Sequence, residues 1–388
     1  MKKGWEIKKL GEVCEELFAG GDVPKDNSSK FETNAFSIPI FSNGEKNKGL
    51  YGFTDVARVT KPSITISARG TIGYSEIRNE PFYPAIRLIV VIPKTDIIEL
   101  SFLKFVISSI DFTHSGSSIP QLTVPMIKGY QIPLPPLHEQ QLIVSILDEA
   151  FAAIAKSRAN AEQNLKNAKE LFESYLQNVF ENKGEGWEEK TFGEVLLKTE
   201  SVDPTKKPDE EFIYLDVSSV NKETKEIENA TVVLGKDAPS RARKLIRTND
   251  VIFATVRPTH SRVALITEEY NEQVCSTGYF VLRAKDFLNN NLVYYFLLTY
   301  GFNKQMEKLQ KGASYPAVND SDVKGIIIPF PKSLKEQQTI VQKLDAFSTE
   351  TKKLEAIYQQ KINDLEELKK SVLQKAFAGE LKEKLVTV

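Results

Sequence analysis

The chain has very little cysteine and histidine. Its 388 residues include two cysteines, Cys14 and Cys275, and three histidines, His114, His138 and His260. Cysteines so far apart in the sequence do not make a disulfide framework, and these five residues lack the spacing of a zinc site. We therefore expect no bound metal, and the scarcity of cysteine is typical of the reducing cytoplasm.

Long apolar runs are also missing. No stretch approaches the roughly 18 apolar residues that a membrane-spanning helix needs. The N-terminal Met1–Glu6 segment has no apolar stretch behind its charges, so we expect no signal peptide. A hydrophobic fraction of 41% and a charged fraction of 27% are typical of a soluble globular protein, and 388 residues suit two domains with connectors.

Recognisable catalytic motifs are absent as well. The sequence has no GxxxxGK[ST] phosphate loop, no glycine fingerprint after a strand, and no Asn-Pro-Pro-Tyr tetrad of the kind that amino-methyltransferases use to hold a flipped base. Carboxylates are plentiful, but none forms a distinctive pair. These absences favour a binding protein over an enzyme. An enzyme with an unrecognised site stays open as a further hypothesis.

What the sequence does contain is a repeated frame. A block that begins at residue 4 returns 182 positions later, and a block that begins at residue 128 returns 196 to 197 positions later. The matched residues are Gly4, Trp5, Glu6, Lys8, Gly11, Glu12 and Val13 with Gly186, Trp187, Glu188, Lys190, Gly193, Glu194 and Val195, and Lys128, Gly129, Ile132, Pro133, Pro135 and Glu139–Gln141 with Lys324, Gly325, Ile328, Pro329, Pro331 and Glu336–Gln338. Two similar frames enclose two dissimilar interiors, which predicts one scaffold holding two different binding heads.

Both interiors are expected to be mixed α/β domains, so the fold class is α+β. β-branched runs bounded by Pro and Gly predict strands at 63–67 and 86–91 in the first half, and at 250–256, 262–266 and 277–282 in the second. Helical spacing predicts helices at 99–110 and 291–300. Each interior ends in a proline-punctuated strand, at 132–136 and 328–331, where proline confines the strand to an edge.

A long amphipathic helix follows each interior. Apolar residues recur at steps of three and four, and eight of ten positions stay apolar when 197 is added. A rod of about 60 Å cannot bury such a stripe on a small domain, so we expect the helices to pack on each other rather than separately on their own domains. The expected interface residues are Ile143, Leu147, Ile154, Leu165, Phe172, Ile340, Leu344, Tyr358, Ile362 and Leu365. Asn182 and Gly379 are candidates for left-handed caps.

The repeat predicts how the parts are arranged. A twofold axis is the commonest way to join two like units, and one perpendicular to the helices makes them antiparallel. We expect mixed α/β domains at 1–137 and 183–333, long helices at 138–182 and 334–380, and a tail at 381–388. The two helices would form an antiparallel coiled coil, with the domains in a pseudo-twofold arrangement. Thr351 and Lys369, which replace Ile154 and Phe172, predict a locally thinner contact.

The net charge of −1 argues against a nucleic-acid binder only on average. Residues 46–69 carry five basic side chains against Asp55, and residues 241–262 carry six against Asp250. Local basic stretches, rather than overall charge, are typical of phosphate binding. Each stretch could also be a solvated strand face with its turns, but finding one in each half favours binding.

Two loops in each half are candidates for contact with DNA: 69–73 with 115–121, and 257–262 with 311–316. Arginine can bond guanine or clamp phosphate, and Thr and His can reach phosphates or base edges. Each loop could also be an ordinary turn whose glycine or proline serves backbone geometry. The candidate residues are Arg69, Thr71, Ser117, Ser118, Arg241, Arg243, Lys244, Arg257, Thr259, His260, Arg262, Ser314 and Tyr315.

The order of these segments resembles the DNA-specificity (S) subunit of type I restriction–modification systems. The resemblance rests on Pro133–Gln141, the Gly186-Trp187-Glu188 restart, Glu336–Gln338 and the closing Leu373–Leu381, and it covers essentially the whole chain. It implies that each interior is a target recognition domain that reads one half of a split DNA site, and that the paired helices act as a ruler between the half-sites.

The resemblance also implies partners. Two methyltransferase (M) subunits would dock on the frame and methylate adenine with S-adenosylmethionine, and restriction (R) subunits would use ATP and Mg to translocate and cut. The S subunit itself would bind no cofactor and would catalyse nothing. A protein-interaction scaffold with two heads and no DNA contact is the alternative, and the near-neutral charge favours it.

Overall fold

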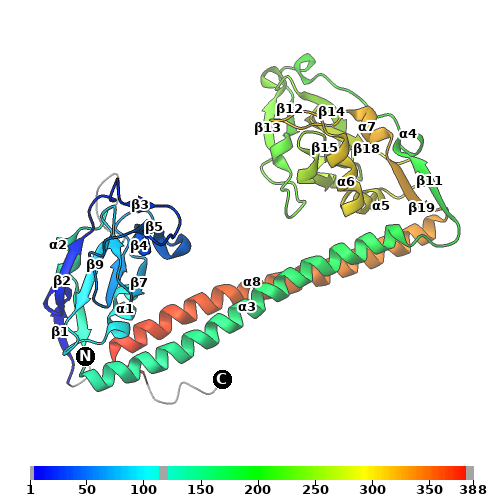
Figure 1. Ribbon diagram of the computed structural model, residues 1–388. Helices are drawn as coiled ribbons and strands as arrows, with labels where there is room; N and C mark the ends of the chain where they lie inside the picture. Colours follow the sequence, from blue (N-terminus) through cyan, green and yellow to red (C-terminus); the bar gives the residue numbers. More distant parts are fainter. Residues whose placement is uncertain (1–3, 113–120, 382–388) are drawn as a thin grey trace. The chain divides into compact units, whose positions relative to one another are not determined.

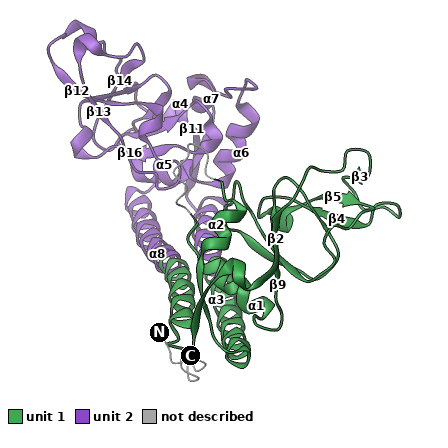
Figure 2. Ribbon diagram, turned by 90° about the vertical axis from the view of Figure 1, so that its left-hand side faces the viewer, with its two compact units in different colours: residues 1–162, 360–388 green, residues 163–359 purple. Residues whose placement is uncertain are grey.

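The computed structural model describes residues 4–112 and 121–381, which fall into two compact units. Unit 1 comprises 1–162 and 360–388, and unit 2 comprises 163–359 (Figure 2). Each unit holds a mixed α/β domain and a portion of both long helices, so the predicted α+β fold with paired long helices is confirmed. The division into domains at 137 and 333 stays a prediction, because the compact units divide within the helices.

The central sheet of unit 1 has four antiparallel strands in the order β2–β9–β6–β7. The strands are β2 (Cys14–Ala19), β9 (Ile89–Pro93), β6 (Ser63–Ile66) and β7 (Ser75–Arg78). β6 and β9 are buried along their whole length, although β6 includes the polar Ser63 and Thr65. The prediction for 63–67 is confirmed. The strand predicted at 86–91 begins only at Ile89, because Ile86 and Arg87 have positive φ and form a turn.

Further strands and two short helices complete the first domain. A second sheet has the order β3–β5–β4–β8, and β1 pairs with β10. These elements are β1 (Glu6–Lys9), β3 (Ser28–Ser29), β4 (Ile38–Phe41), β5 (Leu50–Thr54), β8 (Tyr83–Pro84), β10 (Gln131–Leu134), α1 (Leu100–Ser109) and α2 (Val124–Gly129). The Glu99 carboxylate accepts a hydrogen bond from Phe102 N at 2.5 Å and caps α1, which confirms the helix predicted at 99–110.

Unit 2 repeats this plan with different residues (Figure 1). Its sheets have the orders β16–β15–β18 and β13–β12–β17–β14, and β11 pairs with β19. The strands are β11 (Trp187–Thr191), β12 (Glu211–Leu215), β13 (Thr231–Leu234), β14 (Ala242–Ile246), β15 (Val251–Ala254), β16 (Val263–Leu265), β17 (Gln273–Ser276), β18 (Tyr279–Leu282) and β19 (Ile327–Pro331). Among the described strands, β10 and β19 each pair on one side only, as their prolines predict.

The helices of unit 2 include one correction. The helix predicted at 291–300 is two helices, because α5 ends at Leu297 and Thr299 starts α6 by accepting a hydrogen bond from Phe302 N at 3.2 Å. The helices are α4 (Phe192–Val195), α5 (Asn290–Leu297), α6 (Tyr300–Leu309) and α7 (Asp320–Lys324).

The long helices are α3 (Leu137–Glu181) and α8 (Leu334–Ala378), and they run antiparallel within each unit. In unit 1, Ile143 and Leu147 near the start of α3 share a core with Leu373 and Ala376 near the end of α8. In unit 2, Tyr175 near the end of α3 stacks edge-on against Phe347 near the start of α8, with ring centres 4.8 Å apart. Within the described residues, no helix is both long and apolar enough to cross a membrane.

The stripe residues face the helix contact to different degrees. Ile143, Leu147, Leu344 and Ile362 are buried, whereas Ile154, Leu165, Phe172, Ile340, Tyr358 and Leu365 are half-buried. Two positions of the α8 stripe are not apolar. Thr351 is buried, and its hydroxyl donates back to Phe347 O at 3.0 Å. Lys369 is exposed, with its ammonium 5.3 Å from the centre of the Phe151 ring.

The two predicted helix caps differ. Gly379 has φ 75° and is a left-handed cap as predicted. The prediction for Asn182 is wrong, because Asn182 is not among the described residues with positive φ and its N–H still bonds Asn178 O in helical fashion. The left-handed residue comes later, at Gly186 with φ 87°, and Gly4 has the same conformation with φ 90°. This conformation explains why each frame opens with glycine.

Candidate nucleic-acid interface

The two candidate loops of unit 2 lie against each other. Arg257 N donates to Pro316 O at 2.7 Å, and Val318 N donates to Thr255 O at 3.0 Å. The Arg257 guanidinium lies 5.2 Å from the centre of the Tyr315 ring, and the Tyr315 side chain is 72% exposed. A cation held over an open aromatic face presents both charge and a stacking surface, which suits a nucleotide.

The backbone around Arg257 is held in an unusual conformation. Arg257 (φ 50°) and Ser261 (φ 48°) are both left-handed and flank the short 3₁₀ helix η6 (Pro258–His260). Asn303 on α6 fixes this loop by donating to Thr259 O at 3.2 Å and to Ser261 Oγ at 2.5 Å. Non-glycine residues in this region cost free energy and persist only where their surroundings enforce them.

The loop carries concentrated positive charge. Partial burial lowers the pKa of His260, and the charges of Lys222, Arg257 and Arg262 lower it further, so the imidazole is neutral near pH 7. Arg257 and His260 are exposed, whereas Arg262 is half-buried and donates to Val220 O. Arg262 therefore also has a structural role, whereas the exposed side chains of Arg257 and His260 are accessible to a ligand.

Several cations of the basic stretch already have acidic partners from other segments. Arg243 lies 3.6 Å from Asp203, and Lys244 lies 3.1 Å from Asp320 and donates to Tyr279 O. Residues 241–262 contain Asp250 as their only acidic residue, so the sequence did not predict that Arg243 and Lys244 are neutralised by other segments. Arg241 is exposed and Ser314 is exposed, and their DNA role stays a prediction.

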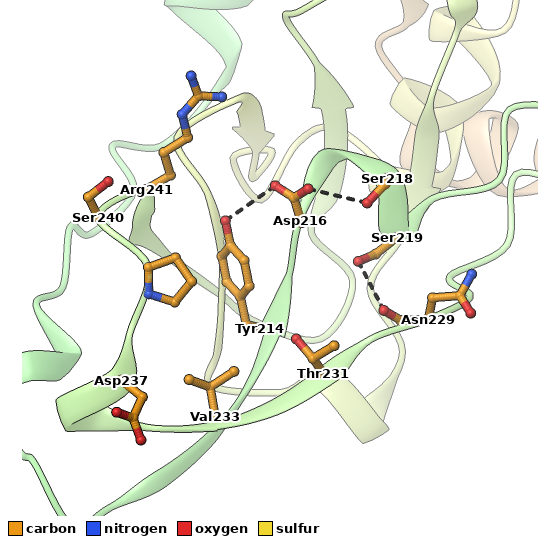
Figure 3. Close-up of a pocket in the computed structure, with 11 residues that line it drawn as sticks. Tyr214, Asp216, Ser218, Ser219, Asn229, Thr231, Val233, Asp237, Ser240 and Arg241 are labelled. Atoms are coloured by element: carbon orange, nitrogen blue, oxygen red, sulfur yellow. Dashed lines mark hydrogen bonds between the residues drawn. The ribbon is translucent and has the colours of Figure 1, made fainter.

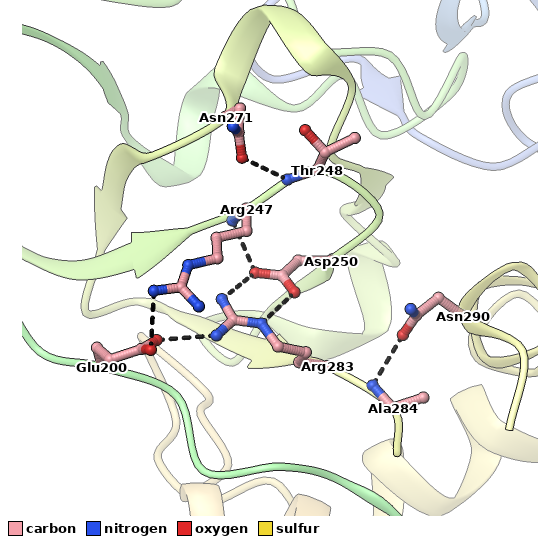
Figure 4. Close-up of polar contacts among 8 residues, drawn as sticks. All are labelled: Glu200, Arg247, Thr248, Asp250, Asn271, Arg283, Ala284 and Asn290. Atoms are coloured by element: carbon pink, nitrogen blue, oxygen red, sulfur yellow. Dashed lines mark hydrogen bonds and ion pairs between the residues drawn. The ribbon is translucent and has the colours of Figure 1, made fainter. Parts of the chain in front are cut away.

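Arg247 belongs to a network rather than to a free patch (Figure 4). It pairs with Glu200 at 3.1 Å, and Glu200 accepts a second hydrogen bond from Arg283 at 2.8 Å. Arg283 also donates to both carboxylate oxygens of the buried Asp250, at 2.8 and 2.7 Å. These hydrogen bonds raise the pKa of the Arg283 guanidinium, and Arg283 in turn lowers the pKa of Glu200.

In the first domain, the Arg69 loop contacts residues 121 and 122, where the second candidate loop ends. Leu122 N donates to Ala68 O at 3.0 Å, and Arg69 Nη2 donates to Gln121 Oε1 at 2.6 Å. Arg69 and Thr71 are exposed. The candidates Ser117 and Ser118 lie outside the described residues.

Arg69 and Arg257 occupy the same place in the two domains. Each is the third residue after the end of a fully buried strand, β6 or β15, and each meets the segment that leads into a short helix, α2 or α7. The polypeptide therefore presents one exposed arginine at the same loop of both domains, although the surrounding sequences differ.

Unit 2 also has an open cavity of about 500 Å³ on the β12–β13 hairpin (Figure 3). Asp216 and Asp237 line it together with Arg241, and Asp216 accepts hydrogen bonds from Tyr214 at 3.3 Å and Ser218 at 3.2 Å. Two carboxylates outweigh one guanidinium, so the cavity favours hydrogen-bond donors over phosphate. Within residues 4–112 and 121–381, no group of three His, Cys, Asp or Glu residues could hold a metal ion.

The fold and its paired loops define a duplicated α+β protein built on two long helices. The chain belongs to the family of the type I restriction modification DNA specificity domain, whose model matches residues 2–166 and 184–367. This match confirms the family that the repeated frame resembles.

Similar proteins extend this result. The chain is 31% identical over 177 residues to a type I specificity subunit of Mycoplasma pneumoniae, covering 46% of this chain and 48% of that one. An alignment of 425 positions with the MjaIX specificity subunit of Methanocaldococcus jannaschii has 22% identity and covers 98% and 94% of the two chains. The matched part spans about half the length of this Mycoplasma pneumoniae specificity subunit and of a second one, 48% and 54% respectively.

Solved structures share the fold. A chain from a study of complex assembly and conformational transition of the type I R-M system has a TM-score of 0.78 at 19% identity, covering 98% of this chain and 99% of that one. The HsdS subunit from Thermoanaerobacter tengcongensis has a TM-score of 0.60 at 20% identity, covering 98% of both.

Sequence reasoning missed Lys222 and Asn303, which surround the Arg257 loop. Both come from distant segments, and nothing in their local sequence separates them from ordinary surface residues. The paired loops themselves carried a signal, since each contains glycine or proline beside small polar residues.

Proposed function

We propose that this chain is the non-catalytic DNA-reading subunit of a type I restriction–modification complex. It binds a bipartite DNA target, with one half-site for each recognition domain, and it scaffolds the M and R subunits. S-adenosylmethionine would then be bound by the M subunits, and ATP and Mg by the R subunits. We propose the cytoplasm as its location, where the host DNA is.

The observation that carries the proposal is the matched pair Arg69 and Arg257. Two domains with unlike interiors present an exposed arginine at the same loop; Arg69 bonds Gln121 of a second segment, and Arg257 lies against the exposed Tyr315. Arginine is the side chain that most often reads guanine or clamps phosphate. Two different readers on one chain favour a DNA site made of two different halves.

Exposed apolar side chains on α8 support the scaffolding part of the proposal. Leu354 is 39% exposed and Ile357 is 59% exposed, and they lie three residues apart on one face of the helix. Adjacent exposed apolar side chains are typical of surfaces that bind other proteins.

The proposal can be tested by selecting binding sequences from a random duplex library with the full chain assembled with its M subunits. We expect the native complex to enrich two short motifs at a fixed separation. Arg69→Ala should relax one motif and Arg257→Ala the other, each weakening binding to the native motif pair about tenfold. The exposed Lys335→Ala on α8 is the control and should leave both motifs unchanged.

Two outcomes would contradict this assignment. A native complex that enriches no motif would overturn DNA reading in favour of the protein-interaction scaffold. Motifs that survive both arginine substitutions would show that other side chains read the DNA.

A further inference from the structure

The turn that links β8 to β9 is strained. Leu88 N donates to Ala85 O at 3.0 Å and closes the turn, and its two central residues, Ile86 and Arg87, have φ of 52° and 61°. A β-branched residue rarely adopts positive φ, because its side chain crowds the backbone. Glycine or asparagine would make this turn without that cost.

The surrounding backbone enforces the strain. Ile86 N donates to Gly21 O at 2.7 Å, Gly20 N donates to Leu88 O at 2.8 Å, and Asn43 Nδ2 donates to Ile86 O at 2.6 Å. A Cβ on Gly20 would lie 2.5 Å from Pro84 O, so this segment can approach only with glycine at that position. Two neighbouring segments, one at Gly20 and Gly21 and the other at Asn43, therefore hold Ile86 and Arg87 in place.

The turn presents its side chains instead of burying them. Ile86 is 42% exposed and Arg87 is exposed. Isoleucine at this position therefore buries little apolar surface. Its burial does not offset the conformational strain of the turn. Strain that is maintained at an exposed position is characteristic of functional sites.

Asn43 links this turn to the Arg69 loop. Its amide oxygen accepts a hydrogen bond from Ala68 N at 2.7 Å, while its amide nitrogen holds Ile86 O. One side chain thus fixes the strained turn and the residue directly before Arg69. In the described part of the chain, neither Arg69 nor Arg87 forms an ion pair, so both charges are free for a ligand.

An arginine next to an exposed branched aliphatic side chain suits a base step in DNA. Arginine bonds guanine at two acceptors, and an aliphatic side chain contacts a thymine methyl or wedges between bases. We propose that the Ile86–Arg87 turn is the base-reading tip of the first recognition domain, with Arg87 bonding a base edge and Ile86 making the apolar contact. This inference rests on the proposed function and adds to it a reader other than Arg69.

The test uses the full chain assembled with its M subunits and the motif pair selected from the random duplex library. Arg87→Ala should weaken binding about tenfold and relax one base position in the motif that Arg69→Ala also affects, leaving the other motif unchanged. Ile86→Gly should raise the melting temperature of the free chain by about 2 °C, because glycine relieves the turn, and should weaken binding at the same time.

The opposite effects of Ile86→Gly separate reading from a structural role. An Ile86→Gly chain that melts higher and binds DNA as tightly as the native chain would overturn the role of Ile86. An Arg87→Ala complex that enriches the native motif unchanged would overturn the role of Arg87, while the proposed function would stand. Failure of the native complex to enrich two motifs would instead refute the proposed function.

Discussion

Gln140 and Gln337 make the same three hydrogen bonds in the two units. Gln140 Nε2 donates to Pro135 O at 2.8 Å and Ile97 O at 3.0 Å, and its Oε1 accepts from Glu99 N at 2.8 Å. Gln337 bonds Pro331 O at 2.7 Å, Phe287 O at 3.0 Å and Asn289 N at 2.8 Å in the same way. The repeated Glu-Gln-Gln block therefore joins each long helix to the strand before it and to the cap of α1 or α5.

This bonding predicts the effect of Gln337→Leu. The substitution leaves two carbonyls and one N–H without partners in a buried place, which should cost about 2–3 kcal/mol and lower the unfolding temperature of unit 2 by several degrees. Scanning calorimetry of the full chain measures the shift. The neighbouring Gln338 is exposed, so Gln338→Leu is the matched control and should melt like the native chain. Equal melting of both variants would show that the three bonds contribute no net stability.

The buried pair Asp250 and Arg283 predicts a second stability effect. Asp250 is 1% exposed, and Asp250→Asn would leave the largely buried Arg283 guanidinium with only the half-exposed Glu200 as its charged partner. We expect a loss of about 3 kcal/mol in the free energy of unfolding, measured by denaturant titration. Glu200 is about half exposed, so Glu200→Gln should cost less than about 1 kcal/mol. A Glu200 variant that loses as much as the Asp250 variant would contradict this ranking.

Periodicity and repetition predicted the frame of the fold from sequence. An apolar stripe runs along most of each 45-residue helix, and tertiary contacts rarely override so long a pattern. The repeated residues also mark structural requirements, such as the left-handed Gly4 and Gly186 and the buried Gln140 and Gln337. Local chemistry was therefore enough for these positions.

The charged site was harder to predict, because the net charge around each basic residue depends on acidic residues from distant segments. Lys244 looked free in its own stretch, yet Asp320 neutralises it from far along the chain. Likewise, Ile86 was predicted to start a strand, because β-branched residues favour strands. In the structure, hydrogen bonds with Gly20, Gly21 and Asn43 impose a strained turn at this position instead. No local pattern contains that information.

His260 predicts a pH dependence for DNA binding. Its pKa lies below the ordinary 6.5, so the free chain holds it neutral near pH 7. A phosphate beside it would favour the protonated form and raise this pKa, so binding should tighten as the pH falls below about 6.5. The stability of the unbound chain has the opposite pH dependence. His260 has a lower pKa in the folded chain than in the unfolded chain, so the unfolded chain takes up the proton first and stability decreases as the pH falls below about 6.5.

The pH effect is measured by fluorescence anisotropy with the native motif pair between pH 5.5 and 8. His260→Gln should remove the part of the pH slope that comes from this residue. His138 is exposed at the start of α3, and His138→Gln should keep the native slope. A His260→Gln complex with an unchanged slope would place His260 away from the phosphate.

The exposed side chain of Ile357 predicts where a protein partner contacts α8. Replacing it with lysine puts a charge on an apolar surface, and burying that charge in an interface would be costly. We expect Ile357→Lys to weaken association with the M subunit at least tenfold, measured by quantitative co-purification and analytical ultracentrifugation. The chain itself should fold normally, because Ile357 is 59% exposed and its loss removes little buried area. Lys361→Ala, one turn along on the exposed face of α8, is the control and should leave association unchanged. Full association of the Ile357→Lys chain would move the contact with the M subunit to another surface.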